Sequence, residues 1–135
     1  MFQAVGSNVS AAGCLISVVS IRDVLTVTMP SDPDDGTVAA LQERVLVALE
    51  KHSARAVVFD LSAVDTFDSF FARIVVETAH MVALMGGRTI VVGMRPAVAI
   101  TATQIGLTLG NIETALNMDR AFAMAEEPPK VRKAL

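Results

Sequence analysis

Two short apolar runs, each bounded by polar residues, most constrain what this chain can fold into. Residues 55–61 (RAVVFDL) and 88–94 (RTIVVGM) are rich in β-branched residues and carry apolar side chains at adjacent positions. A strand that presents apolar side chains on both faces of its pleat is typical of the interior of a sheet that is covered on both sides. We therefore expect two central strands in a sheet with helices packed against it.

The segments around these two runs have the periodicity of helices. Apolar residues recur at helical spacing over residues 37–52. A second helix is expected over residues 69–85, where the pair Gly86–Gly87 ends it. Its apolar stripe comprises Phe71, Ile74, Val75, Thr78, Val82 and Met85. Two shorter helices are expected at residues 96–107 and 119–127.

The remaining strands complete a mixed sheet. Residues 14–20 and 24–29 flank a short polar turn and predict an antiparallel hairpin, and residues 112–117 predict a short edge strand. Strands that alternate with helices indicate a mostly parallel sheet with right-handed crossovers. The predicted fold class is therefore α/β, with a mixed, mostly parallel sheet opened by an N-terminal hairpin and about four helices.

Length and composition bound the organisation of the chain and the class of its partners. A chain of 135 residues fits one domain, which we place at residues 11–126 between a flexible N-terminus (1–10) and a flexible tail (127–135). With 53% hydrophobic and only 4% aromatic residues, the core is expected to be aliphatic, and the apolar surplus indicates self-association. The net charge of -3 argues against nucleic acid as a partner and gives no reason to expect a membrane surface. Cys14 is the one cysteine, which excludes a disulfide within the chain and indicates a reducing, cytoplasmic location.

A serine stands where the chain leaves the first central strand, in the segment 60–69 (DLSAVDTFDS), and binding sites gather at such strand ends. If Ser69 were the nucleophile of a hydrolase, glycines would stand two residues on either side of it, but Phe67 and Phe71 occupy those positions. A nucleophile also needs an imidazole within hydrogen-bond reach, and His80 lies about 16 Å further along the same helix. We therefore expect no hydrolase activity, and we expect that the chain is not an enzyme.

Three carboxylates near this serine, Asp60, Asp65 and Asp68, could coordinate a hard cation. The interpretation that we prefer is that Asp65 and Asp68 are turn and helix-capping residues on a solvated loop. The sequence has no phosphate-binding glycine motif, and two distant histidines with one cysteine are too few ligands for a transition-metal site. We expect neither a metal nor a cofactor.

The residues alone leave two interpretations of Ser69 open. In one, Asp68 caps the helix and Ser69 is merely tolerated in the first turn. In the other, Ser69 is modified, because a helix N-terminus suits a phosphate and Arg73, one turn further on, could pair with it. Since Asp65 and Asp68 are already there, a phosphate would make the surface strongly acidic and repel a docked partner. Phe70 is either an apolar anchor for that partner or a side chain that packs under a neighbouring loop.

Three segments resemble the STAS family (sulfate transporter and anti-sigma factor antagonist domains): VVFDLSAVDTFDSFFARIV, MVALMGGRTIVVGMRPAVAITATQIGL and IETALNMDRAFAMA. The resemblance covers roughly residues 12–126 and is closest to the small, single-domain stressosome scaffold branch, which antagonises a serine/threonine kinase. Its most specific parts are the D-S-F triplet after a D-L-x-x-V-D strand exit and the pattern G-x-R-P-A-V-A-I-T. The loop at residues 30–36 (PSDPDDG) departs from the family in length and acidity, and could alter which paralogue or kinase is accepted.

The resemblance implies that Ser69 is a phosphoacceptor. It also implies that the unmodified protein co-assembles with larger STAS-domain sensor paralogues and holds a serine/threonine kinase of the anti-sigma type, which phosphorylation releases. A PP2C-type phosphatase would reset the serine. Thr101 matches a position that is phosphorylated in the sensor paralogues, although we favour a helix threonine bonded to its own backbone. A second function class stays open, a STAS module that binds a small ligand or lipid without phosphorylation.

Overall fold

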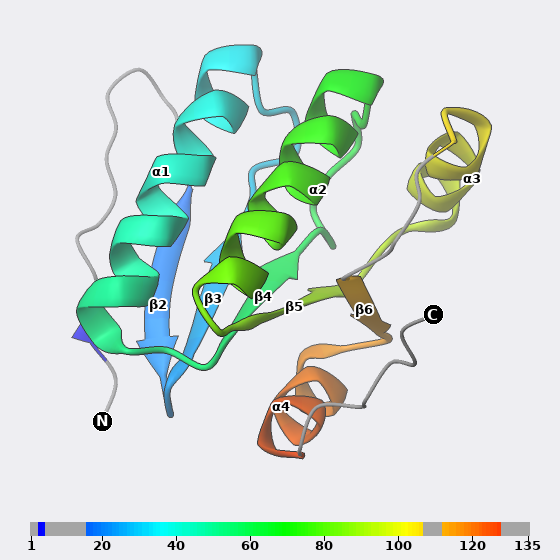
Figure 1. Cartoon of the computed structure of the whole chain (residues 1–135). Coiled ribbons are helices and arrows are strands. Elements are labelled where there is room, and N and C mark those ends of the chain that lie inside the picture. The colour runs from blue at the N-terminus through cyan, green and yellow to red at the C-terminus, as the bar shows by residue number, and fades with distance from the viewer. Residues whose placement is uncertain (1–2, 5–15, 107–111, 128–135) are drawn as a thin grey trace, which may run out of the picture.

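The computed structural model describes residues 3–4, 16–106 and 112–127, which form one six-stranded sheet and four helices (Figure 1). The strands are β1 (Gln3–Ala4), β2 (Ser17–Ile21), β3 (Val24–Thr28), β4 (Ala56–Asp60), β5 (Arg88–Val92) and β6 (Ile112–Ala115). The helices are α1 (Asp35–His52), α2 (Ser69–Leu84), α3 (Pro96–Gln104) and α4 (Met118–Glu126). The predicted α/β class is confirmed.

The six strands lie side by side in the order in which they occur along the chain. Strands β2 and β3 form the predicted antiparallel hairpin, and β3, β4, β5 and β6 are parallel. The hairpin turn places Arg22 and Asp23 in the left-handed region, at φ 51° and 65°, which suits the right-handed twist of the flanking strands. The strand β1 was not predicted, and it pairs with β2 from within the N-terminal stretch that we expected to be flexible.

The helices cover the sheet unequally. Helices α1 and α2 pack together on one face, and α4 lies on the other face against β4, β5 and β6 (Figure 1). Residues 56–59 of β4 are all fully buried, as predicted from the unbroken apolar run. Because β4 and β5 are parallel, the loops that follow them lie at the same end of the sheet.

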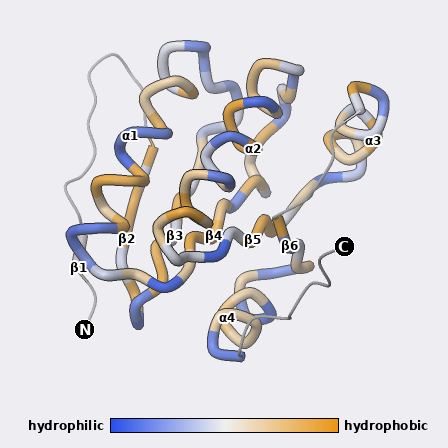
Figure 2. Tube along the Cα trace, viewed as in Figure 1, coloured by the Kyte–Doolittle hydropathy of each residue, from blue (hydrophilic) through white to orange (hydrophobic). Residues whose placement is uncertain are grey.

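The core has two parts, one on each face of the sheet, and the strands β3, β4 and β5 contribute residues to both. Figure 2 shows hydrophobic residues along these strands. Aliphatic side chains dominate, as composition predicted, with Phe59 the largest fully buried residue. The prediction for Met85 was wrong: its side chain is 46% exposed. Met85 follows the last helical residue, and Gly86 at φ 89° turns the chain away from the helix axis.

Predictions that concern the chain ends cannot be compared with the structure. Cys14, Leu107, most of the N-terminal stretch and the tail after Glu127 lie outside the described residues, so the domain boundaries at residues 11 and 126 stay predictions. The helix predicted to reach Leu107 ends at Gln104. Within the described part of the chain, no helix is both long enough and apolar enough to cross a membrane.

Candidate functional site

The chain leaves β4 through a tightly held turn. The Leu61 amide donates to the Val92 carbonyl at 3.0 Å, and the Ser62 amide donates to Asp60 Oδ1 at 2.9 Å. Gly93 stands against this turn, because a Cβ atom at Gly93 would lie 2.8 Å from Ser62 Cβ and 3.1 Å from the Ser62 backbone. The loops that follow β4 and β5 are therefore in direct backbone contact, so the position of the segment after β4 depends on the segment after β5.

Helix α2 begins at Ser69, which is exposed to solvent. Asp68 caps the helix, because its Oδ1 accepts a hydrogen bond from the Phe71 amide at 2.9 Å and its carbonyl accepts one from Ala72 at 3.0 Å. Phe71 and the preceding Phe67 are buried, with ring centroids 5.0 Å apart. Since Asp68 caps the helix and the two rings anchor it, the Ser69 hydroxyl is not needed as the cap of α2, and its phosphorylation stays a prediction.

We predicted four partner-binding residues beside Ser69, namely Asp65, Asp68, Phe70 and Arg73, and the last two lie against each other. Phe70 is half-buried and packs against the core, and the guanidinium carbon of Arg73 lies 5.7 Å from the centroid of the Phe70 ring. Arg73 is exposed and stands one turn after Ser69, on the same face of α2. The exposed part of the Phe70 ring and the Arg73 side chain therefore form one continuous patch next to the serine.

Asp65 forms an ion pair that the sequence analysis missed. Its carboxylate accepts a hydrogen bond from Arg95, the residue that precedes α3, and both side chains are about half exposed. The Asp65 amide also donates to the Ser31 carbonyl at 2.8 Å, so the acidic loop at residues 30–36 lies beside the serine segment. Arg95 lies 30 residues from Asp65 in sequence. One feature of the sequence could have indicated this pair: Arg95 follows β5, a strand parallel to β4, so both residues lie near the carboxyl ends of neighbouring strands.

Thr101 lies in α3 and is half-buried. Its hydroxyl donates to the Ala97 carbonyl at 3.0 Å, which is the backbone-bonded arrangement that we favoured for a helix threonine. Phosphorylation of Thr101 stays a prediction.

The three aspartates considered for metal binding make other contacts in this structure, and neither histidine is hydrogen-bonded to Ser69. His52 ends α1, which precedes β4, so it lies at the opposite end of the sheet from Ser69. His80 is exposed on α2, and no hydrogen bond joins a described histidine to the serine. Asp60 and Asp68 accept hydrogen bonds from local backbone amides, and Asp65 pairs with Arg95. Among residues 3–4, 16–106 and 112–127, no three side chains of the metal-binding types are grouped to hold an ion.

Comparison with known proteins identifies one family. The family model described as "STAS domain" matches residues 16–121. Two curated relatives from Bacillus subtilis (strain 168) are the RsbT co-antagonist proteins RsbRA, 25% identical over 64% of this chain, and RsbRB, 30% identical over 67%. These matches cover 32% and 33% of the two relatives, so the chain spans about one third of their length.

Solved structures of small proteins match nearly end to end. A serine-to-glutamate variant of RsbS from Moorella thermoacetica is 28% identical, with a TM-score of 0.73 over 82% of this chain and 94% of that chain. A chain from a structure of the stressosome, described as a signal integration and transduction hub, is also 28% identical, with a TM-score of 0.67 over 81% of this chain and 95% of the other. The architecture built from β2 to α4 is therefore shared with single-domain proteins as well as with one part of longer ones.

Proposed function

Because the chain belongs to the STAS domain family, among relatives that are stressosome proteins and anti-sigma factor antagonists, we propose that it is a phosphorylation-controlled scaffold. The unmodified chain binds a serine/threonine kinase of the anti-sigma type, within an assembly that it forms with its own copies and with larger STAS-domain paralogues. The kinase phosphorylates Ser69 and is released to act elsewhere. A PP2C-type phosphatase removes the phosphate and restores binding.

The observation that carries this proposal is the exposed hydroxyl of Ser69 at the start of α2. Asp68 supplies the cap, so the serine oxygen can be esterified without loss of a hydrogen bond that holds the helix. In the transfer, the Ser69 oxygen bonds to the γ-phosphorus of ATP, the bond from that phosphorus to ADP breaks, and the hydroxyl proton passes to a base of the kinase. The first amides of a helix have no helical acceptor and favour an anion at this position.

Release follows from the charge that phosphorylation adds. A phosphoserine carries about -1.5 to -2 charges at neutral pH, and here it would directly follow the exposed Asp68 and stand four residues after the exposed Asp65. A kinase surface that fits the neutral hydroxyl and the Phe70 edge would have to desolvate this charge, which costs several kcal/mol when no partner is provided. Arg73 is one turn away and compensates part of the charge, while Arg95 is already paired with Asp65.

The relatives support the same assignment. RsbRA and RsbRB are named as co-antagonists of RsbT, which fits a chain that binds a regulatory partner together with longer paralogues. The solved RsbS carries a glutamate in place of a serine, a substitution that imitates a phosphorylated side chain by its charge. We propose that Ser69 is the corresponding regulated serine of this chain.

The test is retention of the kinase by variants at Ser69. We expect Ser69→Ala to retain the kinase and to block its ATP-dependent release, and Ser69→Asp to weaken retention. Ser62→Ala is the matched control, because Ser62 is an exposed serine on the same segment and its substitution should leave both retention and release unchanged. Intact-mass measurement after incubation with kinase and ATP should show one added phosphate, mapped to Ser69. Equal retention by Ser69→Ala and by the phosphorylated chain would overturn the proposal.

A further inference from the structure

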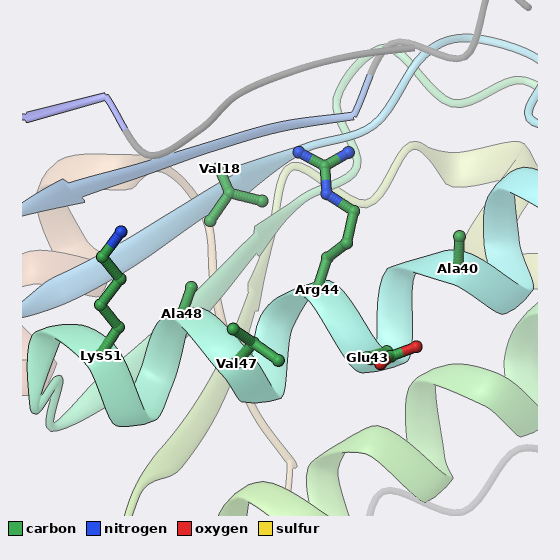
Figure 3. A pocket seen from close by; sticks show the side chains of 7 residues that line it. All are labelled: Val18, Ala40, Glu43, Arg44, Val47, Ala48 and Lys51. Carbon is green, nitrogen blue, oxygen red and sulfur yellow. The ribbon is translucent and has the colours of Figure 1, made fainter. Parts of the chain in front are cut away.

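An open hollow of about 420 Å³ lies between helix α1 and strand β2, and no residue of the serine segment lines it. Its volume falls within the range of small-ligand sites in proteins, roughly 300–1,000 Å³. The buried side chains of Val18 and Ala48 lie at its base. Its border consists of Ala40, Glu43, Arg44, Val47 and Lys51 (Figure 3).

Two cations extend over this hollow from one face of α1. Arg44 and Lys51 are about two helical turns apart, which sets their Cα atoms about 10 Å apart along the axis and within about 20° of each other around it. Figure 3 shows both side chains extending from α1 toward β2, with Val18 and Ala48 between them. Glu43 is the one carboxylate among the described residues that line the hollow, and it lies about 100° around the helix from Arg44. The space between the two cations therefore carries a positive charge.

Neither cation has a carboxylate partner within the described part of the chain. Arg44 is half-buried, and its guanidinium makes one long hydrogen bond there, at 3.5 Å, to the Ile16 carbonyl. Buried donors are normally paired in native proteins, and a guanidinium has several N–H groups in a fixed fork. Most of the donors of Arg44 are thus available to an anion.

We propose that this hollow binds a linear dianion with an apolar middle, of the chemical class of medium-chain α,ω-dicarboxylates. One carboxylate of the ligand accepts a bidentate pair of hydrogen bonds from Arg44, whose planar fork fits that group. The other carboxylate reaches the ammonium of Lys51, two turns further along. The hydrocarbon chain between them covers the base of the hollow.

The side chains between the cations determine that the middle of the ligand is apolar. Val18, Val47 and Ala48 have no side-chain hydrogen-bonding group, so a hydroxyl or amide placed on them would lose water without compensation. Val47 is 57% exposed and loses apolar contact with water when a hydrocarbon chain covers it. The lining residues contain no aromatic ring on which the base of a nucleotide could stack.

The spacing of the cations determines the length of the ligand and the number of its charges. A short dianion such as butanedioate cannot reach Arg44 and Lys51 together, whereas extended octanedioate matches a separation of about 10 Å. A monoanion of the same length leaves one cation without a partner. Both the length and the second charge are therefore required for full affinity.

This inference goes beyond the proposed function and does not depend on it. Ser69 is on α2 and does not line the hollow. We expect Ser69→Ala to bind octanedioate as the unmodified chain does. An empty hollow would leave kinase release untouched, and a failure of kinase release would leave the hollow untouched.

The test is a titration of the isotope-labelled full chain with octanedioate, followed through the chemical shifts of its backbone amides. We expect saturable shifts that are largest at residues 40–51 and 17–21. Arg44→Ala should raise the dissociation constant at least about tenfold, because hydrogen bonds to a charged group are lost. Lys51→Ala should raise it about threefold, as for an exposed ion pair. Arg120→Ala, which removes an exposed arginine of α4, is the matched control and should change nothing.

Octanoate and butanedioate are the matched probes. Octanoate lacks the second carboxylate, so it should bind the unmodified chain about threefold more weakly than octanedioate does. The two ligands should bind Lys51→Ala equally, because the cation that distinguishes them is gone. Butanedioate should bind the unmodified chain and Lys51→Ala equally, because it does not span the two cations.

Three results would overturn the inference. The first is the absence of saturable shifts at residues 40–51 with octanedioate. The second is octanoate that binds the unmodified chain as tightly as octanedioate, which would indicate a site for a fatty acid. The third is a set of shifts at these residues that follows protein concentration without any ligand and that octanedioate does not alter, which would make a second copy the occupant. Amide spectra and melting temperatures of the variants check that the fold is retained.

Discussion

Gly93 offers a sharp test of how the serine segment is positioned, through the substitution Gly93→Ala. The residue has a φ of 72°, and a Cβ there would meet Ser62 at 2.8 Å from its Cβ and 3.1 Å from its Cα and N atoms. Backbone atoms cannot move aside as the end of a flexible side chain can. The substitution therefore combines a left-handed conformation, which costs an L-residue about 1–2 kcal/mol, with overpacking, which costs about 1–3 kcal/mol.

The expected loss in free energy of unfolding is thus roughly 2–5 kcal/mol, a large part of the stability of a domain of this size. Gly86→Ala is the matched control, because Gly86 has a φ of 89° but no heavy atom within 4 Å of a Cβ placed there. In Gly86→Ala we expect only the cost of placing an alanine in the left-handed region, about 1–2 kcal/mol. Both are measured by urea denaturation at equilibrium, with slopes that match the unmodified chain.

The difference in free energy of unfolding between Gly93→Ala and Gly86→Ala measures the cost of overpacking where the loops after β4 and β5 approach each other. We expect Gly93→Ala to be less stable than Gly86→Ala by roughly 1–3 kcal/mol. Equal losses in the two variants would show that the two loops are not in backbone contact, and would refute the reasoning that couples the serine segment to the segment after β5.

Three further predictions concern helix ends. Asp68→Ala should destabilise the chain by about 1 kcal/mol, because the hydrogen bond from the Phe71 amide to the capping carboxylate is lost. Asp68→Asn should retain most of the stability, because an asparagine oxygen can accept the same bond. Equal urea midpoints for the two variants and the unmodified chain would contradict the capping role. Hydrogen bonds from the Thr37 amide and side chain lower the pKa of Asp34 below its ordinary value of 3.8. When folding lowers the pKa of a carboxyl group, its ionised form stabilises the fold at pH values above the ordinary pKa. This stabilisation is lost as the pH falls through the pKa of the folded state. The difference in urea midpoint between the unmodified chain and Asp34→Asn should therefore shrink below about pH 4, and a constant difference would be contrary evidence. Arg88→Ala should cost about 3 kcal/mol and increase amide hydrogen exchange in α4, because Arg88 holds Glu113 and the last carbonyls of that helix; unchanged exchange would count against this.

Local patterns carried most of the architecture. The unbroken apolar run of β4 predicted a strand buried on both faces, and the residue types at the entrance to α2 predicted both the Asp68 cap and the start at Ser69. These features depend on neighbours within one turn of helix or one strand, where sequence spacing determines contact. The error at Met85 arose because helical periodicity was continued one residue past the point where the backbone leaves the helix.

Contacts between distant segments were not predictable in the same way. The ion pair between Asp65 and Arg95 requires knowing how the start of α3 is oriented over the loop after β4. The hydrogen bond from the Asp65 amide to the Ser31 carbonyl likewise depends on the path of the acidic loop at residues 30–36, and a loop has no periodic pattern from which its path could be predicted. From the sequence, Gly93 could be recognised only as a glycine in the loop after a strand. The structure gives the reason for it, which is the close approach of Ser62 from another segment. The site at Ser69 therefore stays a prediction from sequence, while the contacts of its neighbours Asp65 and Gly93 required the three-dimensional structure.

The most direct test of the central claim is the dissociation constant between the chain and its anti-sigma-type kinase, before and after phosphorylation of Ser69. Isothermal titration with the unmodified chain and with the fully phosphorylated chain gives both values under one set of conditions. The account predicts that the phosphate raises the dissociation constant at least about tenfold, corresponding to about 1.4 kcal/mol, while the melting temperature is unchanged or slightly raised. An unchanged dissociation constant, or a loss of binding that follows unfolding of α2, would contradict it.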